Sequence, residues 1–426
     1  MIKRKAFPFF DLAHKHIWTG KGMGMPEYEI EQQIEKYWEN FRKQLNDEDA
    51  KELDKLLMDQ EAQFVDPTED NPIQAVDVAT WLDPTPLMDI LKSRYPYFNM
   101  IKKRFPPRFR FFAYYTLSKK RNLRQAYLSL SEEEFQKLGF TGIPTYEVLR
   151  EFIYERISLE RFPMVFYWVV KELVFLFRKR GIDLGRRTFQ DATDIRALKH
   201  DDEAQYSGYY KESGYKLDVT IDAERDVPLQ YVPLEITSDE GKNLIPSQEH
   251  LISLGIQTKE HIVDDKYATY GNIARSETHG TTMIYTIAKN WVYNTSGTSD
   301  GIKQLYQNYH EENDFVVGAD LEFMLHYLCK KGETEIVGAL FRNQRMAEAE
   351  ENPEGYEQKC NERGSRMEGF FGRMKTTTIL DDHPSQRGWK GFLLRAGLSM
   401  LSLVFAALIR AQNGVLEHLS NVTYVI

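Results

Sequence analysis

The stretch RRTFQDATDIRAL, residues 186–198, decides the fold class because it ends a long helical region and opens a series of β-type segments. Its β-branched and aromatic residues are typical of a strand. Two stretches of the same kind follow, separated by turn residues: GYKLDVTIDAE (214–224) and VPLQYVPLEIT (227–237). We therefore predict three consecutive strands from residue 186.

Helical and strand patterns then alternate. Apolar residues at helical spacing predict helices at 243–255 and 269–278, and short apolar runs predict strands at 261–267 and 281–290. Three strands followed by helix, strand, helix and strand indicate a mixed α/β (α+β) fold with a five-stranded sheet flanked by helices.

Three later segments also carry a pattern. EIVGALFRNQ (335–344) predicts a strand, and RGSRMEGFFGRMKT (363–376) predicts a helix. The most apolar segment is GFLLRAGLSMLSLVFAALIR (391–410), in which only 14 residues lie between Arg395 and Arg410. A membrane span needs about 20 residues, so we expect a buried core helix.

Charge is distributed in three blocks. Residues 1–84 carry 10 basic and 18 acidic side chains, residues 85–187 carry 21 and 10, and residues 188–426 carry 24 and 36. With the helical patterns before residue 186, this asymmetry predicts an acidic helical N-terminal region (1–84), a basic helical DNA-binding region (85–185), an α/β domain (186–412) and a C-terminal tail (413–426).

The basic block opens with residues 92–124, which hold 11 Lys or Arg and no Asp or Glu, interleaved with nine Tyr or Phe. Basic side chains bind DNA by displacing counterions from phosphates. We predict that many of the aromatic residues belong to the core and that the basic residues contact DNA: Lys102, Lys103, Arg104, Arg108, Arg110, Lys119, Lys120 and Arg121.

Two short helical segments follow the basic stretch. Ser131 and Glu134 have the spacing of a capping box, and Thr145 precedes the second helical segment. Short helices joined by the turn GFTGIPT (139–145) fit a helix-turn-helix and equally a generic αα-hairpin. Both interpretations stay open.

Several familiar site signatures are missing. The sequence holds two Cys, which excludes a disulfide framework and a CxxC metal site. It contains no P-loop, GxGxxG, GxSxG or HExxH motif. The first residues include no apolar run typical of a signal peptide, so we expect a cytoplasmic protein.

Three carboxylates occupy positions suited to chemistry. Asp191 lies inside the first strand, Asp264 ends a later strand, and Glu368 lies on a helix. If the two strands are neighbours, their carboxylates lie about one strand spacing (~5 Å) apart, and a helix at that edge adds the third. Such a cluster repels itself unless cations neutralise it. Carboxylate oxygens suit Mg²⁺ or Mn²⁺, and two such ions catalyse phosphoryl transfer.

Other polar residues near these strands are predicted to have no catalytic role. We interpret Asp218 and Asp222 as strand-surface or turn acids, and His261 as a structural residue.

The motifs FQDAT (189–193), VDDKY (263–267) and RMEGFFGRMK (366–375) together resemble the catalytic core of the DDE transposases of prokaryotic insertion sequences. The first acid of that family is followed by a small residue and Thr, as Asp191 is. The second precedes Tyr by three positions, as Asp264 does, although Lys266 stands where the family has Gly and Asp265 is a competing match.

The third acid of the family precedes a Lys by seven residues, as Glu368 precedes Lys375. The family also has an Arg upstream of this acid, which either Arg366 or Arg363 matches. The resemblance covers about residues 186–412. Because 104 residues separate the second acid from the third, it also implies an insertion at about 294–345.

The resemblance implies an RNase H-like core with two Mg²⁺ or Mn²⁺ ions on Asp191, Asp264 and Glu368. It further implies that Arg366 and Lys375 bind DNA phosphate. The expected activity is metal-dependent cleavage at inverted-repeat ends and transfer of the 3′-OH strand into target DNA. The expected partners are double-stranded DNA and a second copy of the chain in a synaptic dimer. The expected location is the nucleoid, away from any membrane.

Three rivals remain. An RNase H-like nuclease or resolvase would cut strands without joining them. An inactive transposase-derived protein would bind DNA without cutting it. A glycosidase with two carboxylates would need no metal, but the basic block disfavours it.

Overall fold

The computed structural model describes residues 66–69, 71–88, 91, 102–120, 122–158, 161–197, 200–209, 211–287, 334–380, 387–416 and 419–425. The chain divides after Val65, and Asp66–Ile426 form one compact unit. The predicted boundaries at residues 84, 185 and 412 fall inside this unit. Residues 1–65, most of the expected insertion and Arg121 lie outside the described residues.

The first part of the unit is helical. Its elements are α4 (Ala75–Thr80), η1 (Thr85–Met88), η2 (Lys102–Arg104), α7 (Phe105–Leu117), α8 (Leu123–Leu128), α9 (Glu132–Lys137), α10 (Tyr146–Arg150), the π-helix η3 (Glu151–Ile157) and α11 (Phe162–Arg178). The predicted capping box of α9 is confirmed, because Glu134 N donates to the Ser131 hydroxyl and Ser131 N donates to the Glu134 carboxylate at 2.7 Å. Thr145 is the N-cap residue of α10, without a side-chain capping bond.

The second part holds a mixed sheet. Its elements are β1 (Arg187–Arg196), β2 (Gln205–Ser207), β3 (Glu212–Asp222), β4 (Pro228–Glu235), η5 (Glu240–Asn243), α12 (Leu244–Ser253), β5 (Glu260–Val263), η6 (Asp265–Tyr267), α13 (Tyr270–Thr278), β6 (Thr282–Tyr285), α16 (Thr334–Glu351), α17 (Pro353–Thr377) and α18 (Gly388–Gln412). The mixed α/β class is confirmed, and each of the five segments predicted as strands between residues 186 and 290 contains an observed strand, although 265–267 form η6 instead of continuing β5. The short strand β2 was not predicted.

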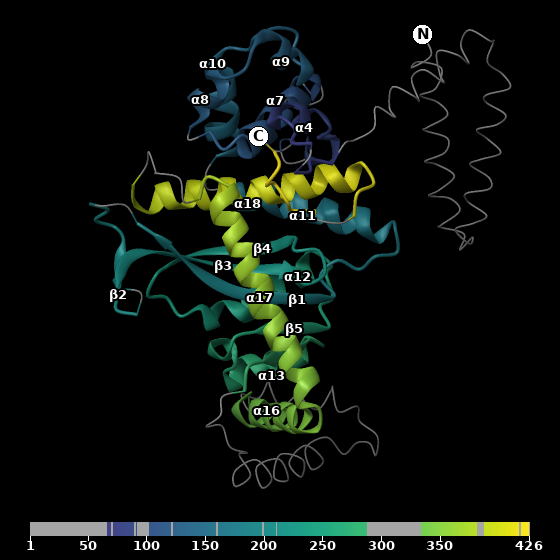
Figure 1. Ribbon diagram of the computed structural model, residues 1–426, viewed down its shortest axis with the longest axis vertical. Helices are drawn as coiled ribbons and strands as arrows, with labels where there is room; N and C mark the ends of the chain where they lie inside the picture. The colour runs from purple at the N-terminus through teal and green to yellow at the C-terminus, as the bar shows by residue number, and fades with distance from the viewer. Residues whose placement is uncertain are drawn as a thin grey trace, which may run out of the picture. The chain divides into compact units, whose positions relative to one another are not determined.

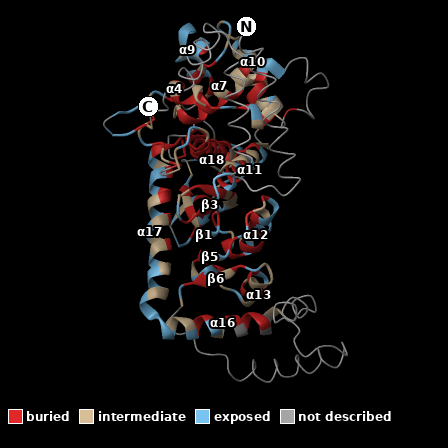
Figure 2. Ribbon diagram, turned by 90° about the vertical axis from the view of Figure 1, so that its right-hand side faces the viewer, coloured by how far each residue is buried: buried red, intermediate tan, exposed pale blue. Residues whose placement is uncertain are grey.

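Strand β1 lies at the centre of the sheet. It pairs antiparallel with β3, which in turn pairs with β4 and β2, and it pairs parallel with β5, which pairs parallel with β6. Figure 2 shows α17 along one face of the sheet and α12 and α13 on the opposite face. Both faces of β1 and β3 are therefore covered, which explains why nearly every residue of β3 is buried.

Helix α18 forms the core between the sheet and the first helices. It packs on α7, α11 and β4, and in Figure 1 it crosses the molecule between the sheet and α7. Among the described helices it is the one long and apolar enough to span a membrane, but 94% of its apolar window is buried inside the unit. Its buried arginines bind groups of the chain: Arg395 Nη1 donates to Leu380 O at 2.7 Å, and Arg410 pairs with Asp66 at 2.6 Å. The predicted buried core helix is confirmed.

The predicted C-terminal tail folds back on the unit. Val425 forms an isolated parallel bridge with Ile73, and Ile73 N donates to Tyr424 O at 3.0 Å. Leu419, Val422 and Val425 are buried. These contacts tie the last described residues to the first.

The strand predicted at 335–344 is wrong, because these residues belong to helix α16. Its buried residues Val337 and Phe341 are four apart, which is a helical spacing, and both join a cluster with Ile273 and Ala274 of α13. A short apolar run does not separate a strand from a buried helix. The contact with α13 selects the helix.

The packing of α18 on α7 gives a direct stability test. Phe405 is fully buried, and its ring meets Phe112 edge-on at 5.8 Å between centroids. We expect Phe405→Ala to lower the free energy of unfolding by about 3–5 kcal/mol, because it leaves a cavity in the core. Urea unfolding measures the change. The control is Phe175→Ala on α11, where the side chain is half exposed, and an equal loss in both variants would contradict this account of the core.

Candidate active site

The register of β1 on β5 brings two of the predicted acids together. The last pair of this parallel ladder joins Phe189 to Ile262. Asp191 and Asp264 each lie two residues further along their strands, so they share a face and occupy neighbouring positions at the same edge. Asp265 is exposed and belongs to the next turn, η6. Of the two competing acids, the structure therefore brings Asp264 to Asp191.

An arginine of α17 lies between these carboxylates. Arg363 is mostly buried, and its Nη1 is 2.5 Å from Asp191 Oδ2 while its Nη2 is 3.9 Å from Asp264 Oδ1. Backbone amides complete the site: Ala192 N donates to Asp191 at 2.8 Å, and Asp265 N donates to Asp264 at 2.9 Å. One guanidinium thus neutralises part of a two-carboxylate cluster.

Burial and charge act against each other on Asp191. Burial raises the pKa of its carboxyl, Arg363 opposes this increase, and the nearby Asp264 carboxylate adds to it. The sequence offered a weak signal for Arg363, since it was one of two arginines matching the family motif. It gave no indication that the guanidinium binds Asp191.

Glu368 does not join this cluster in the described structure. It is exposed on α17, five residues after Arg363, which corresponds to about 140° around a helix. The predicted catalytic role of Glu368 stays a prediction. The structure places Asp191, Arg363 and Asp264 together and Glu368 on another side of α17.

The two carboxylates supply hard oxygen ligands that fit Mg²⁺ or Mn²⁺. Within the described ranges, no group of three or more His, Cys, Asp or Glu side chains is close enough to hold a metal ion. A cation at this edge would therefore have two carboxylates as ligands and would compete with Arg363 for them. The two-ion site stays a prediction.

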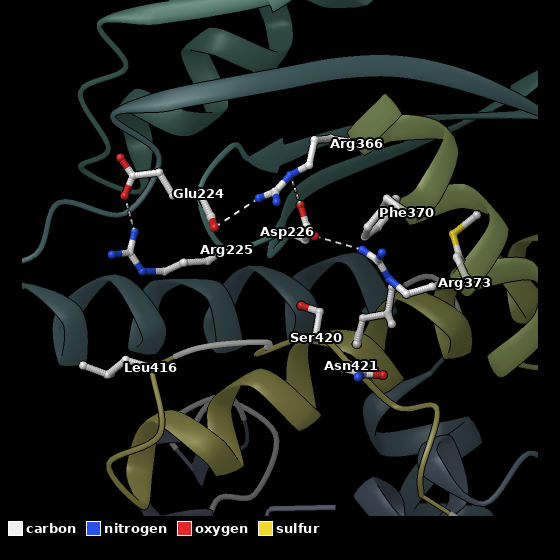
Figure 3. A pocket seen from close by; sticks show the side chains of 11 residues that line it. Glu224, Arg225, Asp226, Arg366, Phe370, Arg373, Leu416, Ser420 and Asn421 are labelled. Atoms are coloured by element: carbon white, nitrogen blue, oxygen red, sulfur yellow. Dashed lines mark hydrogen bonds and ion pairs between the residues drawn. The ribbon is translucent and has the colours of Figure 1, made fainter. Parts of the chain in front are cut away.

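Arg366 and Arg373 belong to a separate pocket beside the turn between β3 and β4. Their guanidinium groups converge on the Asp226 carboxylate at 3.0 and 2.9 Å, and Arg366 also donates to the Ala223 and Glu224 carbonyls. Figure 3 shows this pocket, which has a volume of about 430 Å³ and is closed on another side by Ser420 and Asn421. Arg366 is therefore already bound to other groups of the same chain. Lys375 lies nine residues further along α17 and is half-buried.

The basic residues predicted to bind DNA divide into exposed and engaged groups. Lys102, Lys103 and Arg104 are exposed on η2. The other described members are partly buried: Arg108 lies over the Phe105 ring, Arg110 donates to Leu82 O at 3.1 Å, and Lys119 and Lys120 follow α7. Burial lowers the pKa of Arg110.

The aromatic residues on α7 that the structure describes are buried, as predicted: Phe105, Phe109, Phe111, Phe112, Tyr114 and Tyr115. In Figure 1 this helix lies on the far side of α18 from the sheet.

The face of the sheet opposite α17 carries buried polar residues. The surface interpretation of Asp218 is wrong, because only 1% of this residue is exposed. Asp222 is equally buried, and it caps the following turn by accepting from Glu224 N and Arg225 N. His261 is fully buried, and burial lowers its pKa to about 3, consistent with a neutral structural residue. Alternation along β3 did not reveal this burial, because both of its faces are covered.

Comparison with family models, curated proteins and solved structures finds no match to this chain.

The pair of Asp191 with Arg363 should be energetically coupled. We expect Arg363→Gln to lower the free energy of unfolding by about 2 kcal/mol, because it leaves a mostly buried carboxylate without its cation. Adding Asp191→Asn should recover at least half of that loss. Urea unfolding of the single and double variants forms a double-mutant cycle, and strictly additive effects would contradict the pairing.

Asp218 should make stability depend on pH. Burial raises its pKa to about 7, against about 3.9 in an unfolded chain, so the folded protein binds this proton more tightly. Its contribution is favourable at low pH and is lost as pH rises from about 4 to 7. The variant Asp218→Asn has no carboxyl at this position, so its stability should not fall with pH for this reason. We therefore expect the stability of the variant relative to wild type to increase between pH 5 and pH 7.5 in chemical denaturation, and a constant difference would contradict the raised pKa.

Proposed function

We propose that the protein is a DNA transposase that cleaves strands at inverted-repeat ends and transfers the 3′-OH strand into target DNA. The observation that carries this proposal is the position of Asp191 and Asp264 just beyond the last paired residues of the parallel strands β1 and β5, with Arg363 close to both. These are the acids that the motif resemblance selects, in the order that it implies. The five main strands, with β1 central, support the finer proposal of an RNase H-like core.

In this proposal Asp191 and Asp264 hold Mg²⁺ or Mn²⁺ after Arg363 moves from its ion pair. The metal would activate the attacking water or 3′-OH and neutralise charge on the transferring phosphoryl group. The chain itself positions the strands. The exposed basic residues of η2 would contact DNA outside the carboxylate edge, and pairing of two transposon ends would require a dimer. Cleavage and strand transfer would take place on the nucleoid.

A second candidate is an inactive transposase-derived protein that binds DNA without cutting it. It is favoured by two observations: Glu368 lies away from the carboxylate pair, and Arg363 already forms an ion pair with Asp191. A nuclease or resolvase that cuts without joining is the third candidate, and the carboxylate pair serves it equally well.

Cleavage and joining of labelled DNA separate these candidates. The DNA carries the inverted repeats that flank the gene, and the reactions contain Mg²⁺, Mn²⁺ or EDTA. We expect metal-dependent nicking and strand joining by the wild type. Asp191→Asn should reduce cleavage by roughly 10³-fold or more while leaving binding to the DNA ends unchanged.

Asp194→Asn is the matched control, because Asp194 lies on the same strand but on the opposite face and should retain cleavage. Full cleavage by Asp191→Asn would exclude this site. Binding without nicking by the wild type would favour the inactive protein. Glu368→Gln tests the third acid separately: activity equal to wild type would remove Glu368 from the proposed set and leave the pair in place.

A further inference from the structure

A buried carboxylate lies behind the proposed catalytic pair. Asp218 of β3 pairs with Ala192 of β1, the residue next to Asp191. Because successive strand residues point to opposite faces, Asp218 faces α12 and α13, whereas Asp191 faces α17. The two acids therefore lie on opposite sides of the same part of the sheet.

Asp218 binds both segments that carry the pair. Gln190, which precedes Asp191, donates from Nε2 to both Asp218 oxygens at 3.1 Å. The Tyr267 hydroxyl donates to Asp218 Oδ1 at 3.2 Å. Tyr267 ends the short turn η6 that begins directly after Asp264, and its ring is fully buried. One carboxylate thus connects the residue before Asp191 with the turn after Asp264.

This arrangement is costly for stability alone. A buried carboxylate is unfavourable unless it is both paired with a cation and hydrogen-bonded, and the hydrogen-bond donors to Asp218 seen within the described residues are neutral side chains. Hydrogen bonds from two separate segments to one acceptor fix the distance between those segments. The geometry therefore suits a positioning role better than a stabilising one.

We infer that Asp218 is a positioning residue that sets the separation of the Asp191 and Asp264 carboxylates through Gln190 and Tyr267. The significance of this separation rests on the proposed function, because a divalent cation shared by two carboxylates requires a narrow range of distances. Partners that orient metal ligands from behind commonly change metal affinity 10- to 100-fold when they are removed.

The variants Tyr267→Phe and Asp218→Asn test this inference. Tyr267→Phe removes one hydroxyl and keeps the buried ring, so it preserves the fold even if Asp218→Asn does not. The matched control is Thr220→Val, since Thr220 lies on β3, is equally buried on the same face, and its hydroxyl is without a hydrogen-bond partner in the described part of the chain. Three quantities are measured: Mn²⁺ affinity by electron paramagnetic resonance, kcat and KM for DNA cleavage, and stability in urea.

We expect both variants to weaken Mn²⁺ binding about 10-fold or more and to lower kcat while KM for DNA stays within about two-fold. The double variant should be no worse than Asp218→Asn, because both changes break one connection, and Thr220→Val should behave as wild type. Loss of stability with unchanged Mn²⁺ affinity and kcat would show a merely structural role and overturn the inference. A wild type that neither binds Mn²⁺ nor cuts DNA would instead overturn the proposed function, and the inference with it.

Discussion

The parallel pairing of β1 with β5 determines the chemistry available to this protein. Its register places Asp191 and Asp264 on the same face near each other, and two neighbouring carboxylates repel unless a cation lies beside them. In the described structure Arg363 of α17 is that cation. The same interaction attaches α17 to the sheet, so the electrostatics of the site and the packing of a 25-residue helix are linked.

The sheet is asymmetric in the chemistry of its two faces. On the α17 side, charged residues meet at the edge of the strands, where they are partly open to solvent. On the α12 and α13 side, the polar residues Gln190, Asp218 and His261 are closed off completely. Such a buried polar layer gives less stability than an apolar one, but its hydrogen bonds specify one arrangement of the strands. The positions of the charged residues on the α17 side therefore depend on the hydrogen bonds of the α12 and α13 side.

The sequence was sufficient for most of the α/β part because local signals and tertiary packing agree there. The strands around Asp191 and Asp264 combine β-branched residues with clear turns, and their order implied neighbouring acids. The sequence was insufficient where tertiary contacts determine the structure. Nothing local distinguishes a strand from a helix at Val337 and Phe341, and the rotation of α17 that presents Arg363 rather than Glu368 to the sheet depends on packing along its whole length. The burial of Asp218 follows from a second covering layer that no alternation along β3 could reveal.

The ion pair between Asp66 and Arg410 has a consequence for how the chain is made. The two residues are 344 positions apart in the sequence, and α7 and α11 pack on the helix that contains Arg410. During translation these early helices emerge long before α18, so Phe112 of α7 lacks the Phe405 ring that it meets in the folded chain while the sheet is being synthesised. Contacts of such long sequence separation form slowly, and nascent chains with exposed apolar surface are prone to aggregate. The core between the sheet and the first helices is therefore complete only after α18 has been synthesised.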